Sequence, residues 1–437
     1  MHQEVYDILC AEIRPALGCT GPIGCCYCAA QAYDAIGGEI TAIEAKIDWG
    51  MAAKIDDVAF PGSEMLGAEM AIALGAVCGD LAAGLELLHK VTPEGEAKAR
   101  KVAELVTILP AWDRDYLGGP LEMVVHTDRG VGRAITQGRA DGLIYKECNG
   151  EILYQAEPDA TSVAGKSPLI GYKIKDFYDC AKRTPVERLS FLLDAARLNS
   201  ALAENALRSK VGLGIGPALL AAPDQTDAVR AKAAAAAGCE ARMCGVELPA
   251  MSCGNKGNVG IAASMPLVSL AGDWGCTEEM LQRALAMSYL TALAVIHRIG
   301  KVPSMCSCMV AASLGVAAGA VVLKGGSEAQ AEAAIQNTIP NVFGCVCDGA
   351  KPGCALRLSS STGIALECAQ LALAGVELTA NQGVLAETAD RSLDMLGTMA
   401  LEAMVDSDRE LCRQIFSKRR IFPLESLSQR ITSRKTL

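Results

Sequence analysis

The chain has 437 residues, which is enough for two or three domains that each bury a core. Hydrophobic residues make up 51% of it and aromatic residues only 4%, a composition that favours close-packed helices over a β-sandwich. The net charge of −10 argues against nucleic acid and against an anionic membrane as partners.

Two helices are expected at the N-terminus, with a cysteine between them. Apolar residues at helical spacing predict a first helix over residues 3–14. The second helix is expected to begin near Thr20 and to end at Gly37 and Gly38. Cys19 therefore lies in the loop that leads into a helix.

The pattern changes after residue 38. Residues 39–50 alternate as in a strand, whereas 65–79 and 96–109 show helical spacing. Residues 121–155 predict strands joined by Asp-Arg-Gly and Asn-Gly turns. From Pro185 onward, helical spacing dominates again.

These patterns predict an α+β fold in which a predominantly helical domain is interrupted by a smaller α/β domain. The helical domain would comprise residues 1–38 and 185–437, and the inserted α/β domain residues 39–184. We expect the active site near the interface between the two domains.

One uncharged segment, residues 302–323, is long enough to cross a membrane. Small residues dominate it and no aromatic belt flanks it, so a helix buried inside a helical domain is the better interpretation. The N-terminus is charged and amphipathic, unlike a secretory signal. An odd number of cysteines, 19, does not suit a disulfide scaffold, and we expect a reducing cytoplasm.

Three of the cysteines share one kind of position in the predicted structure. Cys19, Cys306 and Cys347 each stand at the expected start of a helix, where exposed N–H groups favour a thiolate. Iron–sulfur clusters bind thiolates. The C-x-C pairs at 306–308 and 345–347 are not zinc knuckles, and no histidine pair accompanies them. Spacing alone leaves open an iron–sulfur site and a set of buried small residues.

The cysteines at 25, 26 and 28 are a different case, because they fall inside the second helix and scatter around its axis. They cannot all face one metal ion. The glycines of "VGLGIGPALL", residues 211–220, lack the strand, the helix and the distant acid of a dinucleotide site.

Several separated blocks resemble one family. "RPALGCTGP", "ARMCGVELPAMSCGNKGNVGIAASMP", "SMCSCMVAASLGVAAG" and "CDGAKPGCALRLSSS" are similar to the motifs of L-cysteine desulfidases, which are related to the alpha chain of iron–sulfur-dependent L-serine dehydratases. The resemblance implies a [4Fe–4S] cluster with one open iron, held by Cys19, Cys306 and Cys347. Cys308 is the alternative to Cys306. The related families form dimers, which implies a homo-oligomer, a homodimer or larger.

The chain also departs from the family pattern. Gly21 replaces the glutamate that usually follows the Cys-Thr pair, and "CGNKGN" adds Cys253 and Lys256 to a Ser/Gly/Asn-rich block. The turn "QGRADG", residues 137–142, stands where the family has a turn similar to Gly-x-His-Thr. These changes concern possible substrate contacts rather than the cluster ligands.

A small amino-acid substrate needs a partner for its carboxylate, and Arg242 presents a matching fork of donors. Ser252, Asn255 and Asn258 are further candidates for substrate binding, since glycines around them let a backbone approach a ligand closely. Lys256 is a candidate base. Arg242 could equally form an interdomain ion pair, the glycine-rich loop could be only a tight turn, and Lys256 could be solvated.

The expected reaction is α,β-elimination from a small L-amino acid. L-Cysteine, giving pyruvate, ammonia and hydrogen sulfide, is the first candidate, and L-serine or another β-hydroxy acid is the alternative. A thiol-rich redox or metal sensor is the alternative from another class, although neither a DNA-binding nor a signalling domain is visible in the sequence.

Overall fold

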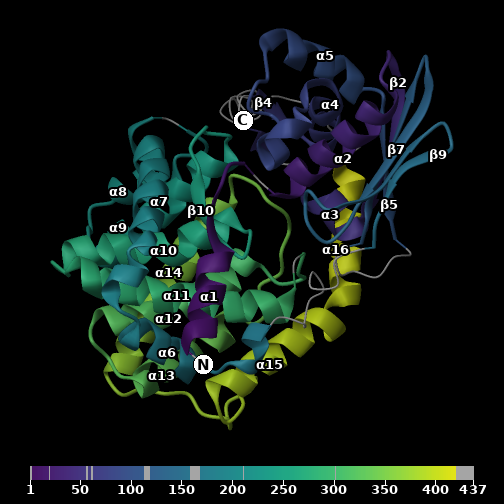
Figure 1. Cartoon of the computed structure of the whole chain (residues 1–437). Coiled ribbons are helices and arrows are strands. Elements are labelled where there is room, and N and C mark those ends of the chain that lie inside the picture. The colour runs from purple at the N-terminus through teal and green to yellow at the C-terminus, as the bar shows by residue number, and fades with distance from the viewer. Residues whose placement is uncertain are drawn as a thin grey trace.

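A mixed sheet of six strands and a larger body of helices make up the computed structural model, which describes residues 2–18, 20–55, 58–60, 63–112, 119–157, 168–209, 211–300 and 302–419 (Figure 1). The sheet runs in the order β5 (Val106–Ala111), β2 (Ile40–Asp48), β6 (Leu121–Thr127), β7 (Gly130–Thr136), β8 (Leu143–Cys148) and β9 (Glu151–Gln155). Only the β2–β5 pair is parallel. The predicted fold class, α+β with helices in the majority, is confirmed.

Tight turns and alternating burial explain the sheet. Asn149 and Gly150 connect β8 to β9 with positive φ angles of 49° and 87°, as an Asn-Gly hairpin turn requires. Along β6 every second residue is buried, beginning with Leu121. Gly132 of β7 lets a helix approach closely, because a Cβ there would lie 2.1 Å from the Ala32 carbonyl oxygen.

Three helices cover the buried face of the sheet, and their apolar residues share one hydrophobic cluster with β2, β6 and β7. They are α2 (Thr20–Ile36), α4 (Ala68–Cys78) and α5 (Pro93–Ala103). The cysteines at 25, 26 and 28 are fully buried in α2. As predicted, they lie inside a helix.

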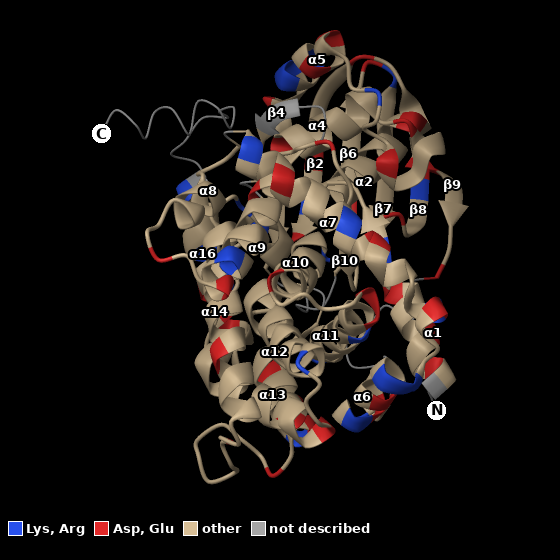
Figure 2. Ribbon diagram, turned by 90° about the vertical axis from the view of Figure 1, so that its left-hand side faces the viewer, with Lys and Arg blue, Asp and Glu red and all other residues tan. Residues whose placement is uncertain are grey.

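A second hydrophobic cluster belongs to the helical body, in which α10, α11 and α12 lie at the centre and carry few charged residues (Figure 2). The helices are α1 (His2–Glu12), α6 (Ile174–Arg183), α7 (Phe191–Arg208), α8 (Ile215–Leu220), α9 (Asp227–Met243), α10 (Gly257–Asp273), α11 (Glu278–Ile299), α12 (Ser307–Leu323), α13 (Glu328–Val342), α14 (Cys354–Leu373) and α15 (Ala389–Thr398). The uncharged segment forms α12 and is buried almost throughout, as expected. In the described part of the chain, no helix has the length and apolar character to span a membrane.

Two pairs of short strands lie outside the six-stranded sheet. Strand β1 (Ile13–Ala16) pairs antiparallel with β10 (Ala250–Cys253), and β3 (Ala59–Phe60) pairs with β4 (Ser63–Leu66). After a π-helical turn at Met399–Ala403, α16 (Val405–Arg419) leaves the helical body and runs along α3 (Trp49–Lys54), as the yellow end of the chain shows in Figure 1.

Two sequence expectations about the elements are wrong. The segment 96–109 is not one helix, because α5 ends at Ala103 and Val106 begins a strand whose β-branched residues pair with β2. The first helix ends at Glu12 rather than at residue 14, since Ile13 already pairs with Cys253. The domain boundaries at 38/39 and 184/185 stay a prediction.

Candidate active site

A short antiparallel contact between two loops brings Cys306 and Cys347 together. The Cys306 N–H donates to the Cys345 carbonyl at 2.8 Å, and the Cys347 N–H donates to the Ser304 carbonyl at 2.7 Å. Met305 and Val346 form a β-bridge between them. The thiols of Cys306 and Cys347 are in hydrogen-bond contact, so residues 41 positions apart share one site.

Other thiols surround this pair. Cys308, in the first turn of α12, hydrogen-bonds with Cys306, and Cys354 begins α14 within electrostatic range of Cys306 and Cys347. The structure leaves the choice between Cys306 and Cys308 open. Cys19 lies outside the described residues, and among those that are described no three His, Cys, Asp or Glu side chains are arranged to hold a metal ion.

Gly18 and Gly21, on either side of Cys19, have described contacts. The Gly18 carbonyl accepts a hydrogen bond from Arg242 at 2.6 Å. A Cβ on Gly21 would lie 3.0 Å from Ile55, the residue after Lys54, and the Lys54 carbonyl accepts from the Ala350 N–H at 2.9 Å. Gly18 is therefore bound to Arg242, and Gly21 lies against Ile55, next to Lys54.

Helix starts do not lower the pKa of these thiols, contrary to the sequence expectation. Cys306 caps α12, whereas Cys347 stands seven residues before Cys354 opens α14. The hydrogen bond with Cys308, and then burial, raise the pKa of Cys306 to about 11. The hydrogen bond with Cys306 and burial also raise the pKa of Cys347, and burial raises the pKa of Cys354 to about 11. The unliganded thiols are thus neutral, and a metal ion must displace their protons.

Two cations lie beside the thiols, and sequence reasoning missed both. Arg357 donates to the Val346 carbonyl at 2.6 Å, forms an ion pair with Asp348 at 2.8 Å, and is in contact with Cys306. Lys54, at the end of α3, interacts electrostatically with Cys347. The position of Arg357 one helical turn after Cys354 was a usable signal, but nothing in the sequence around Lys54 points to this site.

Arg242 occupies a buried position next to Gly18. Arg242 is only 6% exposed. Its guanidinium donates hydrogen bonds to Asn258 Oδ1 at 2.9 Å and to the Gly18 carbonyl. The Nε–H of Arg242 is buried and has no hydrogen-bond partner in the described part of the chain. Glycine at position 257 leaves room for the Arg242 Nε–H group, because a Cβ on Gly257 would lie 2.2 Å from Nε.

The Arg242 contacts are continuous with the thiol cluster. Cys239, one turn before Arg242 on α9, lies within electrostatic range of both Arg242 and Cys354. Cys354 in turn neighbours Cys306 and Cys347. Arg242 and Asn258 therefore lie near the cysteine site. No ion pair of Arg242 is found among the described residues, and its role as a substrate contact stays a prediction.

The other predicted substrate residues lie in β10 and in the turn between β10 and α10. Ser252 is buried and donates to the Arg14 carbonyl at 2.7 Å, which fixes β1 against β10. Asn255 is exposed, with a φ of 60°, and Lys256 is half-buried at the N-cap of α10. The added Cys253 is fully buried and hydrogen-bonds to the Tyr289 carbonyl, so it belongs to the core.

The glycine loop at 211–220 wraps around a buried carboxylate of the protein itself. Glu240 accepts hydrogen bonds from the N–H groups of Leu213 at 2.7 Å, Ile215 at 2.9 Å and Gly216 at 3.4 Å. This arrangement agrees with the rejection of a dinucleotide site. It also anchors the end of α9 that carries Arg242.

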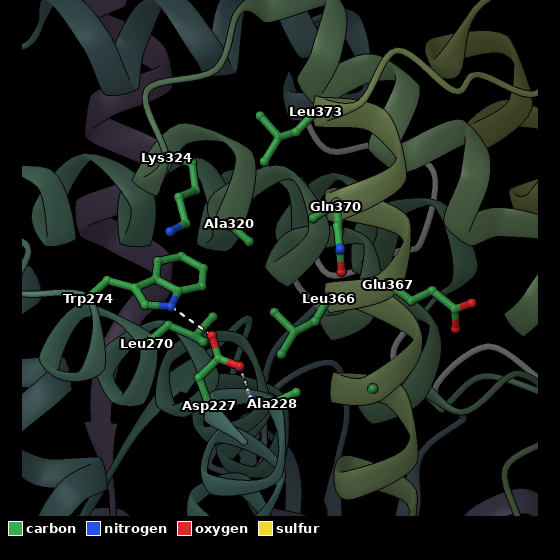
Figure 3. A pocket seen from close by; sticks show the side chains of 12 residues that line it. Asp227, Ala228, Leu270, Trp274, Ala320, Lys324, Leu366, Glu367, Gln370 and Leu373 are labelled. Atoms are coloured by element: carbon green, nitrogen blue, oxygen red, sulfur yellow. Dashed lines mark hydrogen bonds between the residues drawn. The ribbon is translucent and has the colours of Figure 1, made fainter. Parts of the chain in front are cut away.

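A separate cavity of about 550 Å³ lies among α9, α10, α12 and α14, at the ends of these helices that are far from the cysteine site (Figure 3). Trp274 forms its wall, with the Lys324 ammonium 3.5 Å from the ring centroid and an indole hydrogen bond of 2.7 Å to Asp227. The 17 residues of α12 separate Lys324 from Cys306 by about 25 Å. None of the predicted site residues lines the cavity, so it is not the cysteine site.

Residues 82–413 match the sequence profile of the serine dehydratase alpha chain. The chain belongs to this family. Relatives with full-length similarity are a UPF0597 protein of Photobacterium profundum, 36% identical over 93% of this chain and 96% of the relative, and a UPF0597 protein of Caldanaerobacter subterraneus, 32% identical over 92% and 95%. A UPF0597 protein of Bacteroides thetaiotaomicron is 31% identical over 93% and 96%.

Membership of the serine dehydratase alpha-chain family confirms the resemblance found in the motif blocks. It identifies the chain as a serine dehydratase-like lyase that acts on a small molecule. The match begins shortly after α4, extends into α16 and includes Arg242, Cys306 and Cys347, whereas Cys19 and Lys54 precede it.

Proposed function

We propose that this lyase binds a [4Fe–4S] cluster through Cys19, Cys306 and Cys347 and cleaves L-cysteine by α,β-elimination. The observation that supports the proposal most directly is the contact between the Cys306 and Cys347 thiols in a buried site with two adjacent cations. Thiols are the donors that such clusters require, and nearby positive charge offsets the negative charge of the bound thiolates.

The residues present fit the cluster. When bound, it would supply an open iron as Lewis acid for the departing β-substituent. The thiols of Cys306 and Cys347 are in contact, Gly18 is bound to Arg242, and Gly21 lies against Ile55, and the placement of Cys19 beside these thiols is part of the proposal. Cluster loading requires that the neutral thiols lose their protons.

We propose that Arg242 binds the substrate carboxylate. Its free Nε–H is buried, and a guanidinium binds a carboxylate through two donors. Asn258 and the Gly18 carbonyl hold the guanidinium in place. Lys256, next to Gly257, is our candidate for the base that removes the α-proton, and Asn255 in the same turn and Ser252 remain candidates for substrate contact.

The overall reaction balances without an external oxidant. Loss of the α-proton and of HS⁻ from L-cysteine leaves aminoacrylate, which water converts to pyruvate and ammonia. L-Serine is the second candidate substrate, because the matching family is named for serine dehydratase and a hydroxyl can leave in the same way. A homo-oligomer in the cytoplasm stays part of the proposal, and light scattering tests the oligomer.

The test is an anaerobic assay of reconstituted protein with L-cysteine, L-serine and L-threonine side by side, following sulfide and 2-oxo acid. We expect sulfide from L-cysteine, about four irons per chain, and loss of both in Cys19→Ala and Cys347→Ala. Cys368→Ala is the matched control, since Cys368 is also buried but lies on the far part of α14.

Each other outcome has a definite meaning. Dehydration of serine without sulfide from cysteine would assign the chain to the dehydratase reaction. Iron binding without turnover of any of the three would favour the redox or metal sensor. Stoichiometric zinc in place of iron after anaerobic reconstitution would contradict the proposed cofactor.

A further inference from the structure

A buried ion pair between Lys54 and Asp408 lies next to the loops that carry Cys306 and Cys347. The Lys54 ammonium is 2.8 Å from both carboxylate oxygens of Asp408, and the two side chains are 6% and 1% exposed. Lys54 is the last residue of α3 and Asp408 belongs to α16, so the pair joins residues 354 positions apart. Neither was singled out in the sequence.

Lys54 touches the loops that carry both candidate ligands. Its ammonium donates to the Pro303 carbonyl at 3.2 Å, three residues before Cys306. Its own carbonyl accepts from the Ala350 N–H at 2.9 Å, three residues after Cys347. A Cβ on Gly349, whose φ is 99°, would lie 3.1 Å from the Lys54 backbone, so this loop fits closely against Lys54.

The charge of Lys54 is also close to the sulfur of Cys347, with which it interacts electrostatically. A buried ion pair by itself is weak evidence for a stabilising role, because desolvation offsets much of the attraction. A thiolate bound to a metal ion, in contrast, gains from a fixed cation nearby. The position of Lys54 fits the second role.

We propose that Lys54 is a positioning residue for Cys347 as a metal ligand, and that Asp408 of α16 in turn holds Lys54. This inference rests on the proposed function, because it assumes that Cys347 binds the cluster. Lys54 fixes the loop around Cys347 through backbone contacts and supplies positive charge to its sulfur. Helix α16, which Figure 1 shows leaving the helical body to lie along α3, thereby becomes part of the support of the metal site.

The test separates the charge of Lys54 from its contribution to folding. Lys54→Met alone leaves the Asp408 carboxylate buried and unpaired, and destabilises the protein for that reason. The double variant Lys54→Met/Asp408→Leu replaces both partners with apolar side chains of similar size. We expect its melting temperature to return close to that of the wild type.

Iron retention in the double variant then decides the question. After anaerobic reconstitution with ferrous iron and sulfide, we expect the double variant to lose iron to a chelator about 10–100-fold faster than the wild type, as for other residues that support metal ligands. Lys54→Arg, which keeps the charge, should restore much of the retention. Iron per chain and the visible absorption of the cluster are the readouts, independent of turnover.

Arg298→Met is the control for loss of a buried cation elsewhere in the protein. Arg298 is 5% exposed, forms an ion pair at 2.8 Å with Asp394, which is 61% exposed, and its hydrogen bonds reach neither a cysteine nor the Lys54–Asp408 pair. It should lower the melting temperature without changing the rate of iron loss. A double Lys54/Asp408 variant that keeps iron like the wild type would overturn the positioning role and leave the proposed function intact, whereas a wild-type protein that takes up no iron would overturn both.

Discussion

Gly257→Ala tests whether the position of Arg242 depends on a missing side chain. The added Cβ would lie 2.2 Å from Nε and 2.4 Å from Cζ of Arg242. No heavy atoms approach so closely, so the guanidinium must move. Because Arg242 is held by Asn258 at 2.9 Å and by the Gly18 carbonyl at 2.6 Å, the movement breaks or distorts both hydrogen bonds.

The cost follows from the type of contact that is lost. A hydrogen bond to a buried charged group contributes about 1.5–3 kcal/mol net. If one of the two Arg242 hydrogen bonds is lost and the other is weakened, the free energy of unfolding should fall by about 3 kcal/mol. That loss should lower the melting temperature by roughly 5 °C or more. If Arg242 binds the substrate carboxylate, KM should rise more than kcat falls.

Gly272→Ala on the same helix is the control. A Cβ at Gly272 meets no atom within 4 Å, and alanine in place of a helical glycine is worth about 0.5–1 kcal/mol. Thermal unfolding and steady-state kinetics of both variants give the comparison. Equal melting temperatures and equal KM values in the two variants would refute the reasoning.

Three further changes have defined outcomes. Asp48→Asn removes a carboxyl whose pKa is raised by burial from 3.8 to about 6. As the pH rises from about 4 to about 6, the measured unfolding free energy of the wild type should fall by about 3 kcal/mol relative to that of the variant, and above pH 6 the difference should stay constant. A difference that does not change with pH would contradict this. Cys308→Ala should retain iron if Cys306 is the ligand, whereas Cys306→Ala should not; the reverse result, by iron analysis, would make Cys308 the ligand. Glu240→Gln places an amide N–H group against backbone N–H donors and should lower the free energy of unfolding of the protein by about 2–4 kcal/mol. An unchanged melting temperature would contradict this.

The sequence was sufficient to predict the fold class and to select Cys306 and Cys347, but not Lys54 and Asp408 beside them. Helical spacing after Pro185, the uncharged segment that contains α12 and the Asn-Gly turn of the β8–β9 hairpin were interpreted correctly, because these signals are local. The segment after α5 was mispredicted because its strand is defined by pairing with β2, which is 60 residues earlier in the chain.

The same distinction applies to the site. Cys306 and Cys347 could be selected from family motifs, and Arg357 could have been, since it lies on the same predicted helix as Cys354. Lys54 and Asp408 could not, because their role arises only when α16 returns to α3. Helix-start positions predicted thiolates, but burial acts in the opposite direction and depends on tertiary packing.

The ion pair between Lys54 and Asp408 also sets an order of events during synthesis of the protein. At about 5–20 residues per second, the ribosome adds Asp408 roughly 20–70 s after Lys54, since 354 residues separate them. Cys347 itself is made only 61 residues before Asp408, roughly 3–12 s earlier at the same rate. Under the proposed function, nascent chains that stop between Cys347 and Asp408 should release iron that full-length chains keep.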